Sequence, residues 1–157
     1  MSSVLYYESP IGTLKITANA EGITSIWPSN QTAPKLLPEN ELLSSAADWL
    51  DCYFAGKKPE ANLLPLVLKG TYFQKRVWLR LLQIPYGKSI SYGQLAKELA
   101  DNGKMSAQAI GQAVGANPIG IVIPCHRVLG SGKKLTGYAW GLDRKKWLLD
   151  HENISYK

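Results

Sequence analysis

A thiol and an imidazole stand side by side at Cys125 and His126, directly after a short apolar run over residues 119–123. Apolar runs of this length are typical of a buried strand, so we expect a strand here. Pro124 cannot donate to a sheet ladder and keeps the preceding residue extended, which places the thiol where regular structure ends. Such a position suits a reactive cysteine, although an arbitrary Cys-His pair is more often a buried structural cysteine beside a surface histidine.

The chemistry open to this pair is nucleophilic. A thiolate is a soft nucleophile that can take an alkyl group from an aromatic ether oxygen, and it needs a base or a positive environment to form near pH 7. His126 is the candidate base. Adjacent side chains of an extended chain point to opposite faces, so direct contact with Cys125 requires a bend, and a bridging water is the easier geometry. Such a base also needs an orienting carboxylate, as in other catalytic triads.

Length and composition indicate a globular intracellular protein. The 157 residues suffice for one ordinary domain or two small ones. No apolar run approaches the roughly 20 residues of a membrane span, and the first residues lack the pattern of a secretory signal. Two cysteines, Cys52 and Cys125, are too few for a disulfide framework and lack zinc-site spacing. We therefore expect a cytoplasmic or nucleoid-associated protein without metal or cofactor.

The net charge of +6 is unevenly distributed along the chain. Residues 1–70 hold five Lys and Arg against seven Asp and Glu, whereas residues 71–157 hold thirteen against five. The second part, with a charge of +8, is the one that would attract a polyanion such as nucleic acid. An ordinary solvated basic surface gives the same count, so charge alone favours nucleic acid only slightly.

Residues 1–70 predict a small scaffold domain. Strands are expected at 4–8, 12–18 and 23–27, because apolar residues alternate there and turn residues separate the runs. After a loop over 28–38, helical spacing begins at about residue 39 and ends at Gly56. Cys52 is expected near the edge of this helix in a packing role, and residues 57–65 resemble a linker.

Residues 71–157 predict a helical domain. Thr71-x-x-Gln74 and Ser91-x-x-Gln94 have the pattern of capping boxes, and Ser106 can cap a third helix that runs to about residue 116. The second and third helices, joined by a turn over 100–105, resemble a helix-turn-helix. A basic turn over 130–134, a strand or loop over 135–140 and a last helix over about 143–151 complete the domain.

The third predicted helix, residues 107–116, carries almost no bulky side chains. Glycine costs helix stability, so a compensating close approach is expected, either to a neighbouring element or to a groove of DNA. The sequence favours neither explanation. Only Gln108 and Gln112 could contact base edges, so strong sequence specificity is not expected.

Several motifs together resemble the O6-alkylguanine-DNA alkyltransferase family. They are Ile84-Pro85-Tyr86-Gly87, Ser91-Tyr92-Gly93-x-Leu95-Ala96, Asn117-Pro118, Ile123-Pro124-Cys125-His126-Arg127-Val128, Gly137-Tyr138-x-Trp140-Gly141 and Leu148-Leu149-x-His151-Glu152. The resemblance implies an α+β fold, with a small ribonuclease-H-like α/β domain over 1–70 and a winged-helix domain over 71–157. It also implies a monomer that binds double-stranded DNA carrying O6-alkylguanine, or O4-alkylthymine as an alternative, and no membrane.

The resemblance also assigns roles to single residues. Cys125 is implied as the alkyl acceptor, consumed in a single turnover, with His126 as base, Glu152 as its orienting carboxylate and Asn117 as a polar brace. The remaining implied contacts involve Tyr138 as a donor to the leaving guanine, Tyr92 at the phosphate of the flipped nucleotide, Ala107, Gln108, Gln112, Gly115 and Arg127 on DNA, and Val128, Ala139 and Trp140 at the pocket. Trp140 is expected to narrow that pocket against bulky adducts.

Three other readings compete with alkyl transfer. The family's alkyltransferase-like proteins bind damaged duplex without reacting, but they lack the cysteine that is present here as Cys125. A Cys-His hydrolase would need an oxyanion site and would leave the basic helix-turn-helix unexplained. A plain winged-helix regulator would not need the Pro-Cys-His-Arg sequence.

One departure from the family pattern generates a prediction. Gln108 stands where the family usually inserts an arginine into the stack left by the flipped base, and glutamine lacks the charge and the planar fork of arginine. We expect Gln108→Arg to speed transfer from duplex DNA several-fold, about 1 kcal/mol of the extrusion step. Transfer from the free base needs no extrusion, so its rate should stay unchanged. Equal responses of both substrates, or a slower duplex reaction, would contradict this role.

Overall fold

The computed structural model describes residues 3–31, 40–100 and 106–157, and its backbone contacts divide it into two compact units. The first unit extends to Lys69 and includes the short segment Pro118–Gly120. The second unit contains Gly70–Asn117 and Ile121–Lys157. A boundary near residue 70 is visible in the sequence, whereas the return of Pro118–Gly120 to the first unit is not.

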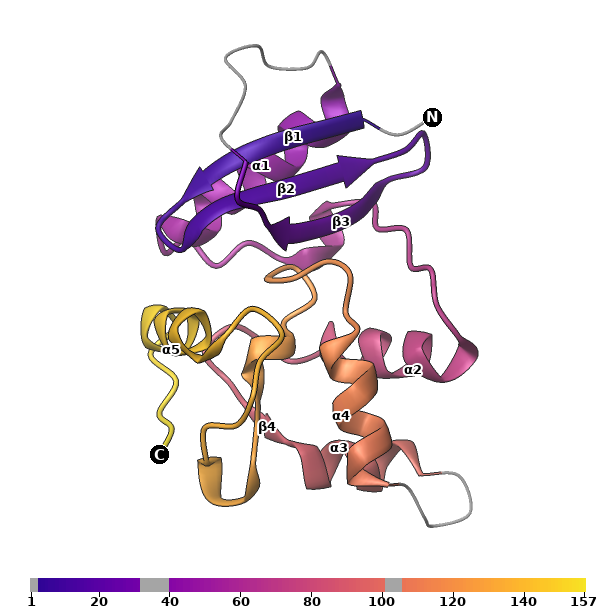
Figure 1. Ribbon diagram of the computed structural model, residues 1–157, viewed down its shortest axis with the longest axis vertical. Coiled ribbons are helices and arrows are strands. Elements are labelled where there is room, and N and C mark those ends of the chain that lie inside the picture. Colours follow the sequence, from indigo (N-terminus) through magenta and orange to yellow (C-terminus); the bar gives the residue numbers. More distant parts are fainter. Residues whose placement is uncertain (1–2, 32–39, 101–105) are drawn as a thin grey trace. The chain divides into compact units, whose positions relative to one another are not determined.

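The first unit consists of an antiparallel sheet with a helix on one face (Figure 1). Strands β1 (Ser3–Ser9), β2 (Gly12–Ala18) and β3 (Ile23–Pro28) lie in the order β1-β2-β3, which confirms the predicted meander. Helix α1 (Glu41–Phe54) contacts all three strands, and the short 3-10 helix η1 (Ala61–Leu63) follows it.

Alternation along β2 determines which side chains form the core of this unit. Leu14 and Ile16 are fully buried, and Ile16 pairs in register with Ile26 of β3. Asn40 caps α1 by accepting from two backbone N–H groups, so the helix begins close to its predicted start. Cys52 is partly exposed on α1, in agreement with its expected edge position. The loop predicted over 28–38 lies outside the described residues from position 32 onward.

The apolar run over residues 119–123 is buried as predicted, but the prediction that it is a strand is wrong. Ile119 forms one isolated parallel bridge with Ile26, and the chain then turns. Ile121 adopts a φ of 69°, which is a strained value for a β-branched residue and ends any extended conformation. The apolar residues of this run indicate that it is buried, but they do not determine its backbone conformation.

The second unit contains most of the helices. Its elements are α2 (Tyr72–Leu81), β4 (Ile90–Ser91), α3 (Tyr92–Leu99), α4 (Ala107–Gly115), the 3-10 helix η3 (Cys125–Arg127), β5 (Val128–Leu129), the 3-10 helix η4 (Ser131–Lys133) and α5 (Leu142–His151). Strands β4 and β5 pair in parallel, and α4 packs against α2 and α3. Residues 101–105 of the predicted turn lie outside the described residues.

The predicted N-terminal caps explain where these helices begin. Thr71 and Gln74 form a complete capping box at α2. Ser91 accepts from the backbone N–H of Gln94 at α3, but the Gln94 side chain donates to Glu98 instead of returning to the cap. Ser106 caps α4 through two backbone N–H groups, as the sequence predicts.

The segment after β5 is held by the last residues of the chain. Gly130 N–H bonds to the carbonyl of Lys134 across the predicted basic turn, and residues 135–140 are a loop. The Leu135 N–H donates to the carbonyl of Lys157, and the Lys157 N–H donates to Lys133. The turn is therefore braced by the C-terminal segment and by its own residues.

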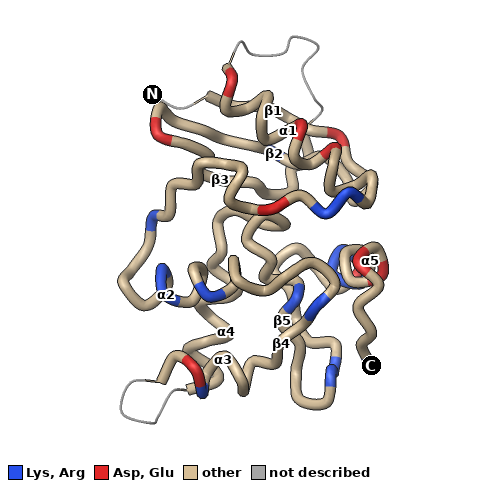
Figure 2. Tube along the Cα trace, turned by 180° about the vertical axis from the view of Figure 1, so that it is seen from behind, with Lys and Arg blue, Asp and Glu red and all other residues tan. Residues whose placement is uncertain are grey.

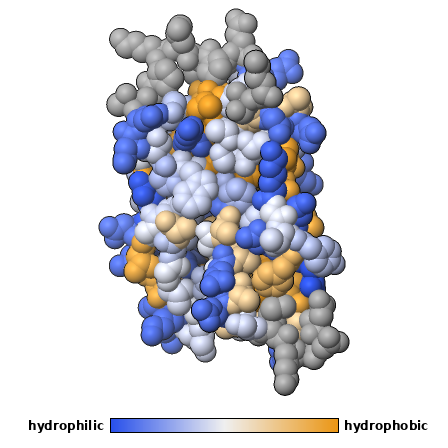
Figure 3. Space-filling model, turned by 45° about the vertical axis from the view of Figure 1, so that its right-hand side comes forward, coloured by the Kyte–Doolittle hydropathy of each residue, from blue (hydrophilic) through white to orange (hydrophobic). Residues whose placement is uncertain are grey.

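Basic residues mark several elements of the second unit, whereas exposed hydrophobic residues are scattered (Figure 2, Figure 3). In Figure 2, Lys and Arg mark α2, α5 and the segments around β4 and β5 in the second unit. On the face in Figure 3, hydrophobic residues form small separate patches among hydrophilic ones. None of the helices in the described ranges is both long and apolar enough to span a membrane.

The fold class predicted from the sequence, a mixed α+β chain with a small N-terminal domain and a helical second domain, is confirmed.

Candidate active site

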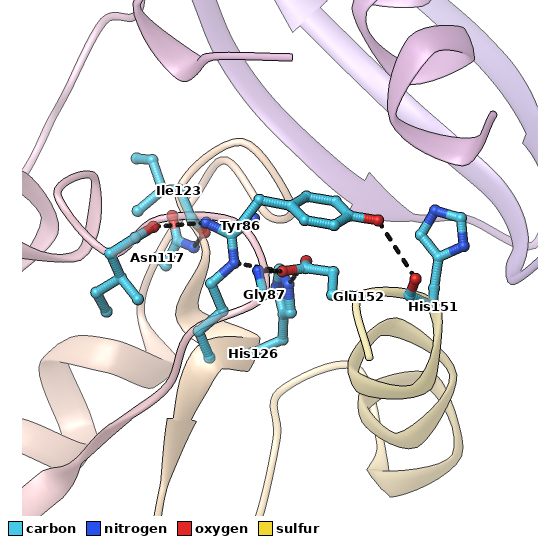
Figure 4. Close-up of polar contacts among 9 residues, drawn as sticks. Tyr86, Gly87, Asn117, Ile123, His126, His151 and Glu152 are labelled. Carbon is cyan, nitrogen blue, oxygen red and sulfur yellow. Dashed lines mark hydrogen bonds and ion pairs between the residues drawn. The ribbon is translucent and has the colours of Figure 1, made fainter. Parts of the chain in front are cut away.

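A buried carboxylate organises the site (Figure 4). Glu152, just after the end of α5, is 2 % exposed. Its Oε2 lies 2.5 Å from His126 Nε2, and its Oε1 accepts from Arg127 Nε at 2.7 Å and from the Gly87 N–H at 3.1 Å. Burial alone would raise the pKa of this carboxyl group, but His126 and Arg127 outweigh burial and hold the pKa well below its usual value. Glu152 is therefore ionised.

The ionised carboxylate fixes the protonation state of His126. This imidazole is fully buried, and burial lowers its pKa despite the opposing influence of Glu152. A neutral imidazole facing a carboxylate carries its hydrogen on the nitrogen nearest that carboxylate, which here is Nε2. Nδ1 is then left as an acceptor, and it has no hydrogen-bond partner among the described residues. The ring is in the form that a general base requires.

Cys125 begins the 3-10 turn that also carries His126, and it is 5 % exposed. The turn supplies the bend that an extended chain lacks, yet the two side chains make no direct hydrogen bond that the structure records. Burial raises the pKa of the Cys125 thiol, whereas the polar groups of Asn117 and Tyr138 and the charge of Lys145 act in the opposite direction. The resting group is a thiol, so reaction requires a base to take its proton.

Asn117 and Arg127 hold the reactive turn from two sides. Asn117 Nδ2 donates to the carbonyl of Ile123 at 2.8 Å, which fits the bracing role implied for it. Arg127 is 7 % exposed and donates to Glu152 and to the carbonyl of Ile84 at 2.6 Å. This placement contradicts the prediction that Arg127 contacts DNA, because its guanidinium is committed to the protein interior.

A cavity of about 570 Å³ opens over Cys125. Its lining residues come from α3, α4, the reactive turn and the loop after β5: Tyr92, Ala107, Gln108, Gly111, Val114, Gly115, Cys125, Thr136, Gly137, Tyr138 and Ala139. Sequence-predicted site residues thus gather around one opening. Besides the buried polar residues described above, Gln112, Val128 and Trp140 also lie outside the lining: Gln112 is exposed on α4, while Val128 and Trp140 are buried. Trp140 contacts the ring of Tyr138, 5.9 Å between centroids, and is not placed where it narrows the cavity.

The glycines of α4 face open space. Among the described residues, a Cβ added to Gly111 or Gly115 would meet no atom within 4 Å, apart from the helix's own backbone and the adjacent residues. Close packing against a neighbouring element of the protein therefore does not explain these residues. Both glycines line the cavity beside Gln108. The surface of α4 at these glycines can therefore be approached closely by a bound molecule.

Two features of the site were not predicted from the sequence. The Gly87 N–H bonds Glu152, and the fully buried Lys145 donates to the carbonyl of Val128 at 2.8 Å. The Gly87 contact is a tertiary backbone contact that leaves no local pattern. Lys145 stands between Arg144 and Lys146, and nothing in this basic run of the sequence marks it as the buried residue.

Fold and site together define a protein with a basic helical domain that carries a buried cysteine at a cavity, followed by a histidine that a buried carboxylate orients. Two family models cover the chain: 6-O-methylguanine DNA methyltransferase, ribonuclease-like domain, at residues 4–68, and 6-O-methylguanine DNA methyltransferase, DNA binding domain, at residues 72–154. The chain belongs to the 6-O-methylguanine DNA methyltransferase family.

Relatives and solved structures agree with these models. Methylated-DNA–protein-cysteine methyltransferase of Mycobacterium tuberculosis H37Rv is 43% identical over 92% of this chain and 88% of its own length. The Methanosarcina acetivorans protein of that name is 42% identical over 93% and 95%. The crystal structure of Mycobacterium tuberculosis OGT in complex with DNA matches with a TM-score of 0.81 and 42% identity, covering 94% of this chain and 90% of that one.

The position of Glu152 predicts a large loss of stability for Glu152→Gln. The substitution leaves the buried Arg127 without its counter-charge, and breaking such a pair costs about 3–5 kcal/mol. Because the pKa of Glu152 is lowered on folding, its contribution is present above the ordinary value of 4.5 and is lost as the pH falls below it. Urea unfolding at pH 7 and at pH 3.5 should show the difference between wild type and variant shrinking in acid.

Glu98→Gln is the matched control. Glu98 pairs with Arg80 at 2.8 Å on a partly exposed surface, where an ion pair contributes at most about 1 kcal/mol. Equal losses in the two variants would show that the buried position of Glu152 is not what matters.

Proposed function

We propose that this protein repairs duplex DNA directly, by transferring the alkyl group of O6-alkylguanine to Cys125. The observation that carries the proposal is one arrangement: a thiol lies in a cavity beside α4, and a neutral histidine oriented by a buried carboxylate follows it in the chain. The relatives named as methylated-DNA–protein-cysteine methyltransferases and the related structure in complex with DNA support the same function.

The proton transfer follows from the protonation states. The Cys125 proton passes to His126 Nδ1, through a bridging water in our proposal, while the other hydrogen stays on His126 Nε2 and is donated to the Glu152 carboxylate in a charge-assisted bond. The imidazolium that forms is stabilised by the ionised carboxylate, as in other triads. Glu152 thus orients the base and offsets its charge without accepting the proton.

The bond changes balance with no further reactant. The Cys125 sulfur attacks the alkyl carbon, the S–C bond forms, and the C–O6 bond breaks with its electron pair left on guanine. The proton taken from the thiol is returned to the guanine, with the Tyr138 hydroxyl placed at the cavity to donate as negative charge grows. The product is a thioether at Cys125. Its S–C bond is stable and no group among the described residues of the site is available to cleave it, so we expect each protein molecule to react once.

A paired base is out of reach inside the duplex stack, so the nucleotide must flip into the cavity. Tyr92, Gln108 and Ala139 line the cavity, and we expect them to contact the flipped nucleotide. The open space beside Gly111 and Gly115 supports a close approach of α4 to a groove of the duplex, which is one of the two explanations left open by the sequence. We further propose that the protein acts as a cytoplasmic or nucleoid-associated monomer.

Mass spectrometry tests the acceptor directly. After incubation with one equivalent of duplex containing O6-methylguanine, the intact protein should gain the mass of one methylene group, located in the peptide that contains Cys125. Cys125→Ser should bind the same duplex and gain nothing. A label on Cys52, or more than one methyl group removed per protein molecule, would refute the proposal.

The open glycine of α4 predicts opposite effects on stability and on binding. Gly111→Ala should raise the free energy of unfolding by about 0.5–1 kcal/mol, because alanine is the better helix former. The added methyl group should weaken duplex binding at least about fivefold, roughly 1 kcal/mol, by holding α4 away from the groove. Urea unfolding and fluorescence anisotropy measure the two quantities.

Ser45→Ala on the exposed face of α1 is the control for this pair of measurements. It should give a helix gain of about 0.5 kcal/mol with unchanged DNA affinity. If Gly111→Ala also leaves the affinity unchanged, α4 does not lie against the duplex.

A further inference from the structure

Lys145 is the one lysine of the described residues that is fully buried. Its ammonium donates to the carbonyls of Val128 at 2.8 Å, Thr136 at 3.3 Å and Gly137 at 3.4 Å. In the part of the chain that the structure describes, no carboxylate lies within ion-pair distance of it. The charge therefore rests on neutral acceptors alone.

This burial is costly for stability. Desolvation lowers the pKa of Lys145 to about 8, so the group is still mostly protonated near neutral pH. Buried charges are commonly replaced by apolar side chains with no loss of stability, so a role in packing alone gives no reason for an ammonium at this point. The groups around the ammonium suggest what the charge does.

Four titratable groups face or sense this charge. The ring centroids of Tyr92 on α3 and Tyr138 in the loop after β5 each lie 5.9 Å from Nζ. In the reactive turn, the positive charge lowers the pKa of the Cys125 thiol and also that of His126. Lys145 is thus the unpaired cation whose charge acts on the nucleophile.

We propose that Lys145 is a positioning residue of the transfer reaction, whose ammonium joins the Thr136–Gly137 lining of the cavity to Val128 and sets a positive charge beside the cavity that Cys125 also lines. The proposal rests on the function proposed above. From thiol to transition state, negative charge appears first on sulfur and is then shared with the leaving O6. A fixed cation beside the cavity stabilises charge at both stages.

Thiol reactivity tests this role without DNA or guanine. In a Cys52→Ser background, iodoacetamide reports Cys125 alone, and its rate against pH gives the pH of half-maximal reaction. Lys145→Met should raise that pH by about one unit or more, because a nearby positive charge is lost. Lys145→Arg should leave it close to the parent value. Transfer from the free O6-methylguanine base should fall at least tenfold in Lys145→Met at pH 7.

Lys146→Met is the matched control, because it removes one charge from the exposed face of the same helix. If it shifts the thiol profile as far as Lys145→Met does, net charge and not position is responsible, and the proposal fails. An unchanged profile in Lys145→Met also overturns it. Should Lys145→Met fail to fold by circular dichroism, Lys145→Gln, which keeps a donor and removes the charge, must show the same shift.

The iodoacetamide profile also separates this proposal from the proposed function. If the wild-type protein took no methyl group from alkylated duplex, the proposed function would fail, while the effect of Lys145 on the thiol could still be measured. If the wild type transfers normally and the Lys145→Met profile is unchanged, only the role of Lys145 fails.

Discussion

The ion pair between Glu152 and Arg127 determines the geometry of the reactive turn. One carboxylate, buried to 2 % exposure, accepts from His126 and Arg127 of the reactive turn and from the N–H of Gly87, which lies on a distant segment of the second unit. A buried carboxylate is stable only with such partners, and a buried guanidinium likewise needs an anion. Because His126 and Arg127 are consecutive to Cys125, satisfying these charges also fixes the backbone that carries the thiol.

The same contacts set the protonation states before any substrate arrives. The ionised carboxylate assigns the hydrogen of His126 to Nε2 and leaves Nδ1 as the acceptor, while burial keeps both the imidazole and the Cys125 thiol neutral. A neutral thiol is inert toward most electrophiles. In the proposed reaction the thiolate therefore forms only when a proton moves to Nδ1, and this requirement limits side reactions of the proposed acceptor.

Local patterns predicted much of the fold, and tertiary contacts account for what they missed. Alternation and capping residues such as Thr71 and Ser106 act within one element, so the sheet and the starts of α2 and α4 were predictable. The strand expected over residues 119–123 failed because burial does not determine φ at Ile121. Cys125 and His126 were visible as neighbours, and Glu152 entered only through family resemblance. The burial of Arg127 and Lys145 depends on which distant carbonyls and carboxylates the fold brings to them.

The buried charges of the second unit do not balance, and the imbalance has the sign that alkyl transfer needs. Glu152 offsets Arg127, whereas Lys145 has only neutral carbonyl and hydroxyl oxygens as acceptors among the described residues, so the surroundings of Cys125 carry a surplus of positive charge. At rest this surplus costs stability, as the lowered pKa of Lys145 records. Between thiol and thioether the reaction passes through a negative sulfur and a negative leaving oxygen. In the role proposed for Lys145, the surplus is compensated only during that passage, so its cost in the resting protein becomes stabilisation of the transition state.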